Sequence, residues 1–164
     1  MSDDVLIRPA CPADVEAMAQ LAQELAQQPL LRRYGATPAG LSAELTRLAA
    51  SPTERGEQLL LVQAAGPGRL LGLARFHPSG TFAVGGYLRL IALLPGHQGR
   101  GLGTALLRAV EDAVRAHSRA LFLLVSQDNE AAQRFYARRG YQQAGCLPDF
   151  VRPGLTEIIC WKRL

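Results

Sequence analysis

A glycine-rich segment, Gln98-Gly99-Arg100-Gly101-Leu102-Gly103-Thr104, holds the residues of this 164-residue chain best suited to bind a ligand. It follows an apolar run at residues 88–94 and precedes residues 102–117, where apolar side chains recur at helical spacing. The first amides of a helix have no partner inside it, and the helix dipole adds positive charge there. Glycine also lets a loop approach an anion closely. The segment therefore predicts a phosphate-binding turn between a strand and a helix.

Two common phosphate-binding motifs do not fit this segment. A P-loop requires a lysine after its last glycine, whereas Thr104 follows Gly103 directly. A dinucleotide-binding fingerprint requires a third glycine where Thr104 stands and an acid about 20 residues later, yet the nearest acid there is Asp128. A loop that used glycine only for packing would need one or two glycines, so three favour an anion site.

A third pattern does fit: Arg or Gln, two residues, Gly, one residue, then Gly or Ala. Gln98, Gly101 and Gly103 satisfy it, and here the chain resembles the GNAT superfamily of acetyl-CoA-dependent N-acetyltransferases. The resemblance covers nearly the whole chain. The other segments that resemble the family are Ile7-Arg8-Pro9-Ala10, Leu93-Leu94-Pro95, Ser126-Gln127-Asp128-Asn129-Glu130-Ala131-Ala132 and Phe135-Tyr136-x-x-x-Gly140-Tyr141. It implies direct transfer of acetyl from acetyl-CoA to a primary amine of a small molecule or peptide, without a metal.

The resemblance also implies which residues bind the coenzyme A thioester. The loop amides would cradle its pyrophosphate, and the strand before the loop would pair with the pantetheine arm through its backbone. Asn129 would contact the same arm, although a residue at a helix start can equally be only a cap. The implied set is Ile91, Ala92, Leu93, Gln98, Gly99, Arg100, Gly101, Leu102, Gly103, Thr104, Asn129 and Tyr136.

Tyr136 is the predicted catalytic residue. An amine that attacks a thioester expels a thiolate, and a phenol with a pKa of about 10 is matched to donating a proton to it. The resembling family often places a tyrosine here for that role. Its neighbour Phe135 is better suited to pack under the sheet.

The chain departs from the family at Arg89, where many members carry a Glu or Asp that acts as a base through water. The base therefore stays open among His77, Glu157 and Asp149. A cation on this strand also suggests the hypothesis that Arg89 binds a substrate carboxylate. The missing acid supports one alternative function, a non-catalytic module that binds or senses acyl-CoA.

The elements that must position these residues form a mixed α/β fold, a single domain over residues 1–164 with about six or seven strands and about four helices. The expected order is β-α-α-β-β-β-α-β-α-β-β. Strands are expected at residues 5–8, 58–64, 70–77, 82–94, 120–125, 141–147 and 156–161, and helices at residues 11–28, 38–50, 102–117 and 128–139. The unit from residue 88 to 125 predicts a parallel strand pair with a right-handed crossover.

Glycine and proline mark the connections in this scheme. Turns are expected at Gly66-Pro67-Gly68 and at Pro78-Ser79-Gly80, and a bulge at Gly85-Gly86. Pro29 is expected to end the first helix, so that residues 30–38 form a loop.

The composition is that of a globular domain, with 48% hydrophobic and 20% charged residues. No apolar run is long enough to span a membrane, and the acidic start Met1-Ser2-Asp3-Asp4 lacks the basic residues of a secretory signal. Three separated cysteines fit a reducing cytoplasm and show no metal-ligand spacing. The net charge of +4 comes from dispersed basic residues, which does not favour nucleic acid. A homodimer is compatible with the resemblance, and no residue pattern determines it.

Overall fold

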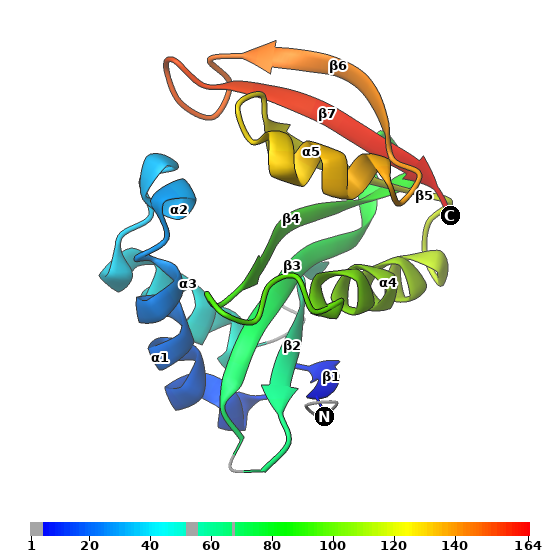
Figure 1. Ribbon diagram of the computed structural model, residues 1–164. Coiled ribbons are helices and arrows are strands. Elements are labelled where there is room, and N and C mark those ends of the chain that lie inside the picture. The colour runs from blue at the N-terminus through cyan, green and yellow to red at the C-terminus, as the bar shows by residue number, and fades with distance from the viewer. Residues whose placement is uncertain (1–4, 52–55, 67) are drawn as a thin grey trace. The chain divides into compact units, whose positions relative to one another are not determined.

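The computed structural model describes residues 5–51, 56–66 and 68–164 (Figure 1). The acidic start and Pro67 of the expected turn lie outside this range. In chain order the elements are β1 (Val5–Pro9), a 3₁₀ turn (Pro12–Asp14), α1 (Val15–Leu25), α2 (Pro29–Arg33), α3 (Pro38–Ala50), β2 (Gln58–Ala64), β3 (Leu70–Thr81), β4 (Gly85–Leu93), α4 (Leu102–Arg115), β5 (Ala120–Ser126), α5 (Glu130–Ala137), β6 (Gln142–Pro148) and β7 (Thr156–Arg163). The strand order in the mixed sheet is β1-β2-β3-β4-β5-β7-β6. The predicted mixed α/β fold is confirmed.

The chain folds as two compact units, and β3, β4 and α4 each contribute to both. The N-terminal unit comprises the described residues up to Phe76 together with Leu90–Asp112, and the C-terminal unit comprises His77–Arg89 and Ala113–Leu164. No helix in the described part of the chain is both long and apolar enough to cross a bilayer.

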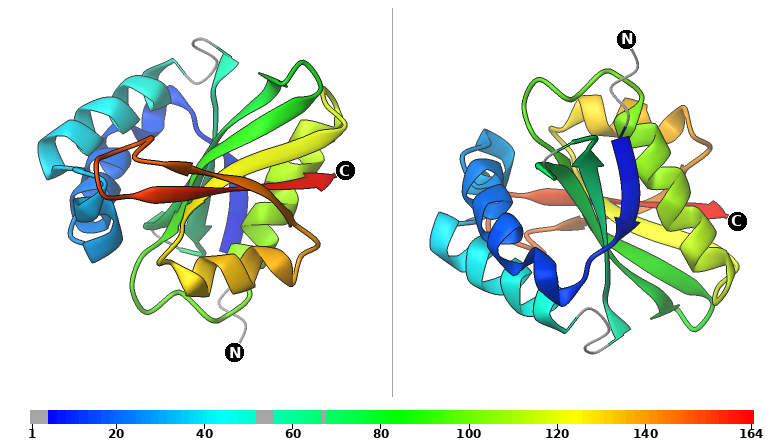
Figure 2. Two further views of the ribbon diagram at one scale, coloured as in Figure 1. Left: turned by 90° about the horizontal axis from the view of Figure 1, so that it is seen from above. Right: turned by 90° about the horizontal axis from the view of Figure 1, so that it is seen from below.

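In the N-terminal unit, α1 and α3 pack side by side (Figure 2). Both helices place apolar residues at helical spacing, so that each has one stripe to bury. The core they share with the strands includes the buried residues Met18, Leu21, Leu25, Leu45, Leu48, Leu61 and Leu73. Strands β1, β2 and β3 pair antiparallel in this unit.

In the C-terminal unit, β4 pairs in parallel with β5 from Gly85 to Leu88, which confirms the predicted parallel pair. Strand β7 then pairs antiparallel with β5 on one side and with β6 on the other. Helix α5 supplies the buried Tyr136 to this unit.

Residues 30–38 do not form the expected continuous loop. Helix α1 ends at Leu25, and Pro29 occupies the first turn of the short helix α2. Proline suits this position because the first amides of a helix need no partner within it. The described residues thus contain one more helix than expected, because a proline that follows one helix can also begin the next.

The expected turn at Pro78-Ser79-Gly80 is wrong, since β3 continues to Thr81. The reversal falls at residues 82–84, where Phe82 and Ala83 adopt φ of 48° and 61°. Hairpin turns of type I′ have two consecutive residues at positive φ, because this backbone matches the twist of the strands. Glycine or asparagine usually provides them, so the sequence carried no signal for a turn here.

The expected bulge at Gly85-Gly86 is absent from the β4–β5 ladder, which runs evenly through both residues. Close approach of other groups gives a reason for glycine at both positions. A Cβ at Gly85 would collide with the ring of Phe122, and one at Gly86 would lie 2.7 Å from the His77 carbonyl oxygen.

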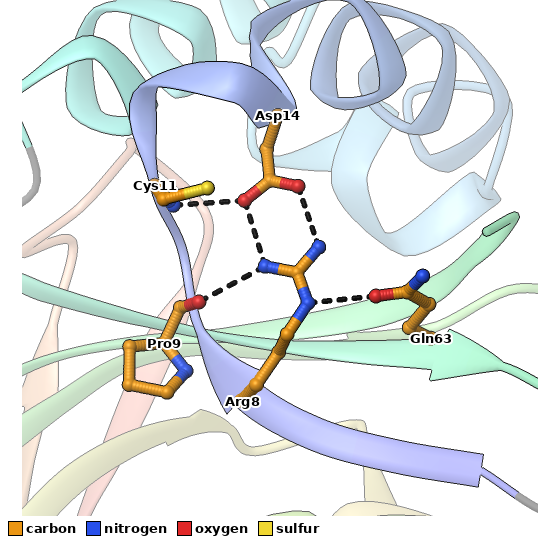
Figure 3. A network of polar contacts seen from close by, with 5 residues as sticks. All are labelled: Arg8, Pro9, Cys11, Asp14 and Gln63. Carbon is orange, nitrogen blue, oxygen red and sulfur yellow. Dashed lines mark hydrogen bonds and ion pairs between the residues drawn. The ribbon is translucent and has the colours of Figure 1, made fainter.

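A polar network around Arg8 ties β1 to the turn that follows it and to β2 (Figure 3). The guanidinium donates to both carboxylate oxygens of Asp14 at 2.6 and 2.8 Å, and its Nε donates to Gln63 Oε1 at 2.7 Å. The Cys11 amide donates to the same carboxylate at 2.8 Å. The Arg8 hydrogen bonds hold the pKa of Asp14 at about 2, below its ordinary value of 3.8.

We expect the substitution Asp14→Asn to destabilise the fold at neutral pH by about 1–2 kcal/mol. The folded-state pKa lies below the unfolded value, so this stabilisation is complete above about pH 5 and is lost as the pH falls toward 2. Urea unfolding at pH 7 and pH 3 measures it, and the difference between wild type and variant should shrink by roughly half. The exposed Glu16, substituted by Gln, is the control. A pH-independent Asp14 effect would contradict the assignment.

Candidate active site

The glycine loop between β4 and α4 has the backbone that the sequence predicts. Gly96, Gly99 and Gly101 adopt φ of 85°, 76° and 81°. A Cβ on any of the three would meet no atom within 4 Å, so conformation and not space requires glycine there. The first helical bond of α4 runs from the Ala105 amide to the Gly101 carbonyl at 3.0 Å.

The loop is exposed from Gln98 to Gly101 and leads directly into α4. Positive φ at Gly99 and Gly101 alternates with negative φ at Arg100 and Leu102. This alternation turns successive amides toward one side and forms a concave site for an anion. The amides of Leu102, Gly103 and Thr104 precede the first helical bond, as is usual at a helix start. The geometry suits a phosphate group.

The end of β4 presents alternate backbone groups to its two sides. The Leu94 amide donates to the Leu71 carbonyl of β3 at 2.8 Å. Because backbone groups alternate along a strand, those of Ala92 also face β3, whereas those of Ile91 and Leu93 face away from it. Of the three residues expected to pair with a pantetheine arm, two therefore have suitably directed backbone.

The Leu93 carbonyl accepts two side-chain amides in the N-terminal unit. Gln98 Nε2 lies 3.4 Å from it, so this side chain folds back from the glycine loop onto the strand. Gln28 Nε2, from the α1–α2 connection, donates to the same oxygen at 2.9 Å. Sequence reasoning missed Gln28, because a single glutamine 65 positions away carries no signal for this contact.

Asn129 caps α5: its side-chain oxygen accepts the Ala132 amide at 3.1 Å. The helix-cap interpretation is confirmed. Capping uses only the oxygen of the carboxamide, so a contact through its nitrogen to a cofactor is compatible with it.

Tyr136 and Phe135 lie in different environments, and Tyr136 is the more buried of the two. Tyr136 is buried, and its ring packs against Tyr141 with 5.5 Å between centroids. Phe135 is half-buried, and the Arg139 guanidinium lies 3.6 Å above its ring. Burial, with a smaller effect of Cys160, raises the pKa of the Tyr136 phenol. The phenol thus keeps its proton at neutral pH, as a hydrogen-bond donor must.

The three candidate bases, His77, Glu157 and Asp149, lie in different structural surroundings. Asp149 lies in the β6–β7 connection with φ of 53°, and its carboxylate accepts the Gly154 amide at 2.6 Å, so it shapes that turn. His77 lies within β3, not in a turn, and is half-buried. Glu157 is buried on β7, and Arg89 is exposed on β4.

Comparison with known proteins agrees with these features. The model of the acetyltransferase (GNAT) family matches residues 30–141. Protein YdhI of Bacillus subtilis (strain 168) is 38% identical over 68 residues, which cover 37% of this chain and 42% of that protein. The chain thus matches less than half the length of this curated relative.

Solved structures with similar folds cover nearly the whole chain. A GNAT-family structure from Desulfovibrio desulfuricans is 25% identical, covers 98% of this chain and 99% of its own, and superposes with a TM-score of 0.74. The protein yncA of Salmonella typhimurium, solved with its cofactor acetyl-CoA, is 19% identical over 98% and 94% of the two chains, with a TM-score of 0.75. A ribosomal-protein-alanine N-acetyltransferase from Brucella melitensis is 20% identical over 97% and 99%, with a TM-score of 0.76.

The matched range, residues 30–141, contains the glycine loop, Asn129 and Tyr136. The chain belongs to the GNAT acetyltransferase family.

Proposed function

We propose that this protein is an N-acetyltransferase that uses acetyl-CoA and transfers the acetyl group directly to a primary amine of a small molecule or peptide. The observation that carries the proposal is the exposed loop with Gly99 and Gly101 in the left-handed region at the start of α4. Outward amides and a helix N-terminus together suit a pyrophosphate.

The residues present fit acetyl-CoA, which when bound supplies an activated acetyl thioester. The amides from Gly99 to Thr104 would hold the pyrophosphate. The outward backbone of Ile91 and Leu93 would hold the amide-containing arm, each hydrogen bond contributing about 0.5–1.5 kcal/mol net. Acetyl-CoA bound to the similarly folded yncA protein supports this choice.

Transfer of the acetyl group requires the following changes in bonds and protons. The amine nitrogen bonds to the acetyl carbon, the carbon–sulfur bond breaks, the amine loses a proton to water or a base, and the sulfur gains one. Tyr136 is proposed to donate a hydrogen bond to the departing sulfur, because its buried phenol stays neutral. Burial raises the pKa of the Cys160 thiol, which disfavours a thiolate nucleophile and agrees with direct transfer.

Release of free thiol in the presence of acetyl-CoA and a panel of amines tests the proposed activity. Acetylated product from at least one primary amine is expected. Binding of acetyl-CoA without turnover on any amine would instead support the non-catalytic acyl-CoA-binding module. A cytoplasmic location and a homodimer stay predictions, to be checked by fractionation and by sedimentation.

We expect Gly101→Ala to weaken coenzyme A binding about tenfold or more, because a left-handed φ costs a side chain about 1–2 kcal/mol and the loop would relax. Calorimetric titration with coenzyme A measures the change. Gly96→Ala is the matched control, since Gly96 also has a positive φ and open surroundings but lies outside the proposed pyrophosphate-binding residues 99–104. Equal losses in the two variants would argue against the pyrophosphate site.

We expect Tyr136→Phe to lower kcat about 10²-fold or more and to change the KM for acetyl-CoA little, because only the donor of the hydrogen bond is removed. Steady-state kinetics with a good amine acceptor measures both constants. Tyr141→Phe removes a hydroxyl from the adjoining buried ring and is the control. An unchanged kcat under conditions where chemistry limits turnover would exclude the role.

A further inference from the structure

One face of the sheet in the C-terminal unit carries apolar side chains that are only half-buried. Tyr87, Phe122 and Trp161 are paired neighbours across β4, β5 and β7, so they point to the same side. Leu124 lies two positions after Phe122 on β5, and its partner Ile159 lies two positions before Trp161 on β7, so both share this face. We term these five residues the aromatic face.

The opposite face of the same strands is covered and fully buried. It carries Leu121, Leu123 and Cys160, and it is the face toward which Tyr136 of α5 lies, close enough to Cys160 for the two groups to interact. By contrast, each of the five residues of the aromatic face keeps part of its side chain exposed.

The aromatic rings form a continuous row. Phe122 stacks on Trp161 with centroids 6.0 Å apart and an angle of 18°. Phe82, at the tip of the β3–β4 hairpin, packs edge-on against Phe122 at 5.1 Å and is 71% exposed. A row of this kind offers apolar area and flat rings to a ligand with an apolar or aromatic group.

Two charges lie at one end of this face. Arg89 follows Tyr87 by two positions on β4 and is exposed, and Glu157 precedes Trp161 by four on β7 and is 1% exposed. Period-2 alternation puts both on the side of the aromatic face. Burial raises the pKa of the Tyr87 phenol, while Arg89 lowers it and Glu157 raises it, so both charges act on this phenol.

We propose that the aromatic face binds the acceptor, and that the acceptor is an amino acid with an apolar or aromatic side chain, whose carboxylate Arg89 binds. The inference rests on the proposed function and names its substrate class. Charge complementarity favours this acceptor, because Arg89 is an exposed cation at the end of the aromatic face and would attract a carboxylate. Polyamine acceptors, which carry only positive charge, would be repelled.

The dimensions of the face agree with such an acceptor. Two positions along a strand span about 7 Å. An amino acid whose carboxylate binds Arg89 can therefore place its own side chain over Tyr87, Phe122 and Trp161 of the aromatic face. A guanidinium has five N–H donors and a carboxylate takes two of them, so Arg89 can keep its contacts within the protein.

Trp161 is the single tryptophan of the chain, so its fluorescence reports on the face without any need for turnover. We expect L-phenylalanine to change the emission saturably in the presence of coenzyme A. Phenethylamine, which lacks the carboxylate, should bind at least about tenfold more weakly. Equal affinities of the wild-type protein for the two ligands would overturn the proposal without any variant being made.

Arg89→Gln should weaken L-phenylalanine binding about tenfold or more and leave phenethylamine binding nearly unchanged. Arg163→Gln is the matched control, because Arg163 is an exposed arginine on the same face at the opposite end. An equal loss in the control would overturn the assignment. Arg89→Lys, which keeps the positive charge, should recover part of the affinity.

Two further outcomes separate this inference from the proposed function. Saturable binding of L-phenylalanine without thiol release on any amine would retain the acceptor site and reject the enzyme. Turnover of amines regardless of a carboxylate would retain the enzyme and reject the inference. Trp161 emission that depends on protein concentration and not on amino acid would mean that a second copy of the chain covers the face, which also rejects it.

Discussion

The hydrogen-bonding capacity of β4 is the constraint on which the site depends. Each of its backbone groups needs a partner, yet the ladder to β5 runs only from Gly85 to Leu88. Beyond it, the Leu93 carbonyl points away from β3 and is met by the side chains of Gln28 and Gln98. Side chains thus complete a sheet edge where a strand would ordinarily do so. A ligand rich in amides, such as the proposed acetyl-CoA, would suit the same edge.

The glycine loop and the buried Tyr136 would meet two different electrostatic requirements of the proposed reaction. To bind the proposed pyrophosphate, the loop would offer partial positive charge in water through exposed amides that the backbone conformation turns outward. To donate the proposed hydrogen bond, Tyr136 would have to keep its proton, and its burial makes the phenolate costly. Neither proposed role requires a charged side chain, which is compatible with the dispersed charges of the chain.

Arg89 bears on how the acceptor would be recognised and on which group would remove its proton. Arg89 is an exposed cation, and both it and the buried Glu157 act electrostatically on the half-buried Tyr87 phenol. An arginine cannot accept a proton at neutral pH, so in the proposed reaction Arg89 would serve recognition and not base catalysis. The amine would then lose its proton to water or to another group, and the apolar surface around Trp161 would help to select the acceptor.

The sequence by itself determined the order of the elements, the glycine loop, the cap at Asn129 and the family, because these depend on local spacing and on backbone preferences. It did not predict the turn at Phe82 and Ala83 or the start of α2 at Pro29, where tertiary context overrode the local signal. Only the tertiary structure decided that Tyr136 is buried while Phe135 is not, that Gln28 reaches Leu93, and that Arg89 shares a face with Trp161. Those relations join residues far apart in the chain, and no local pattern encodes which of them meet.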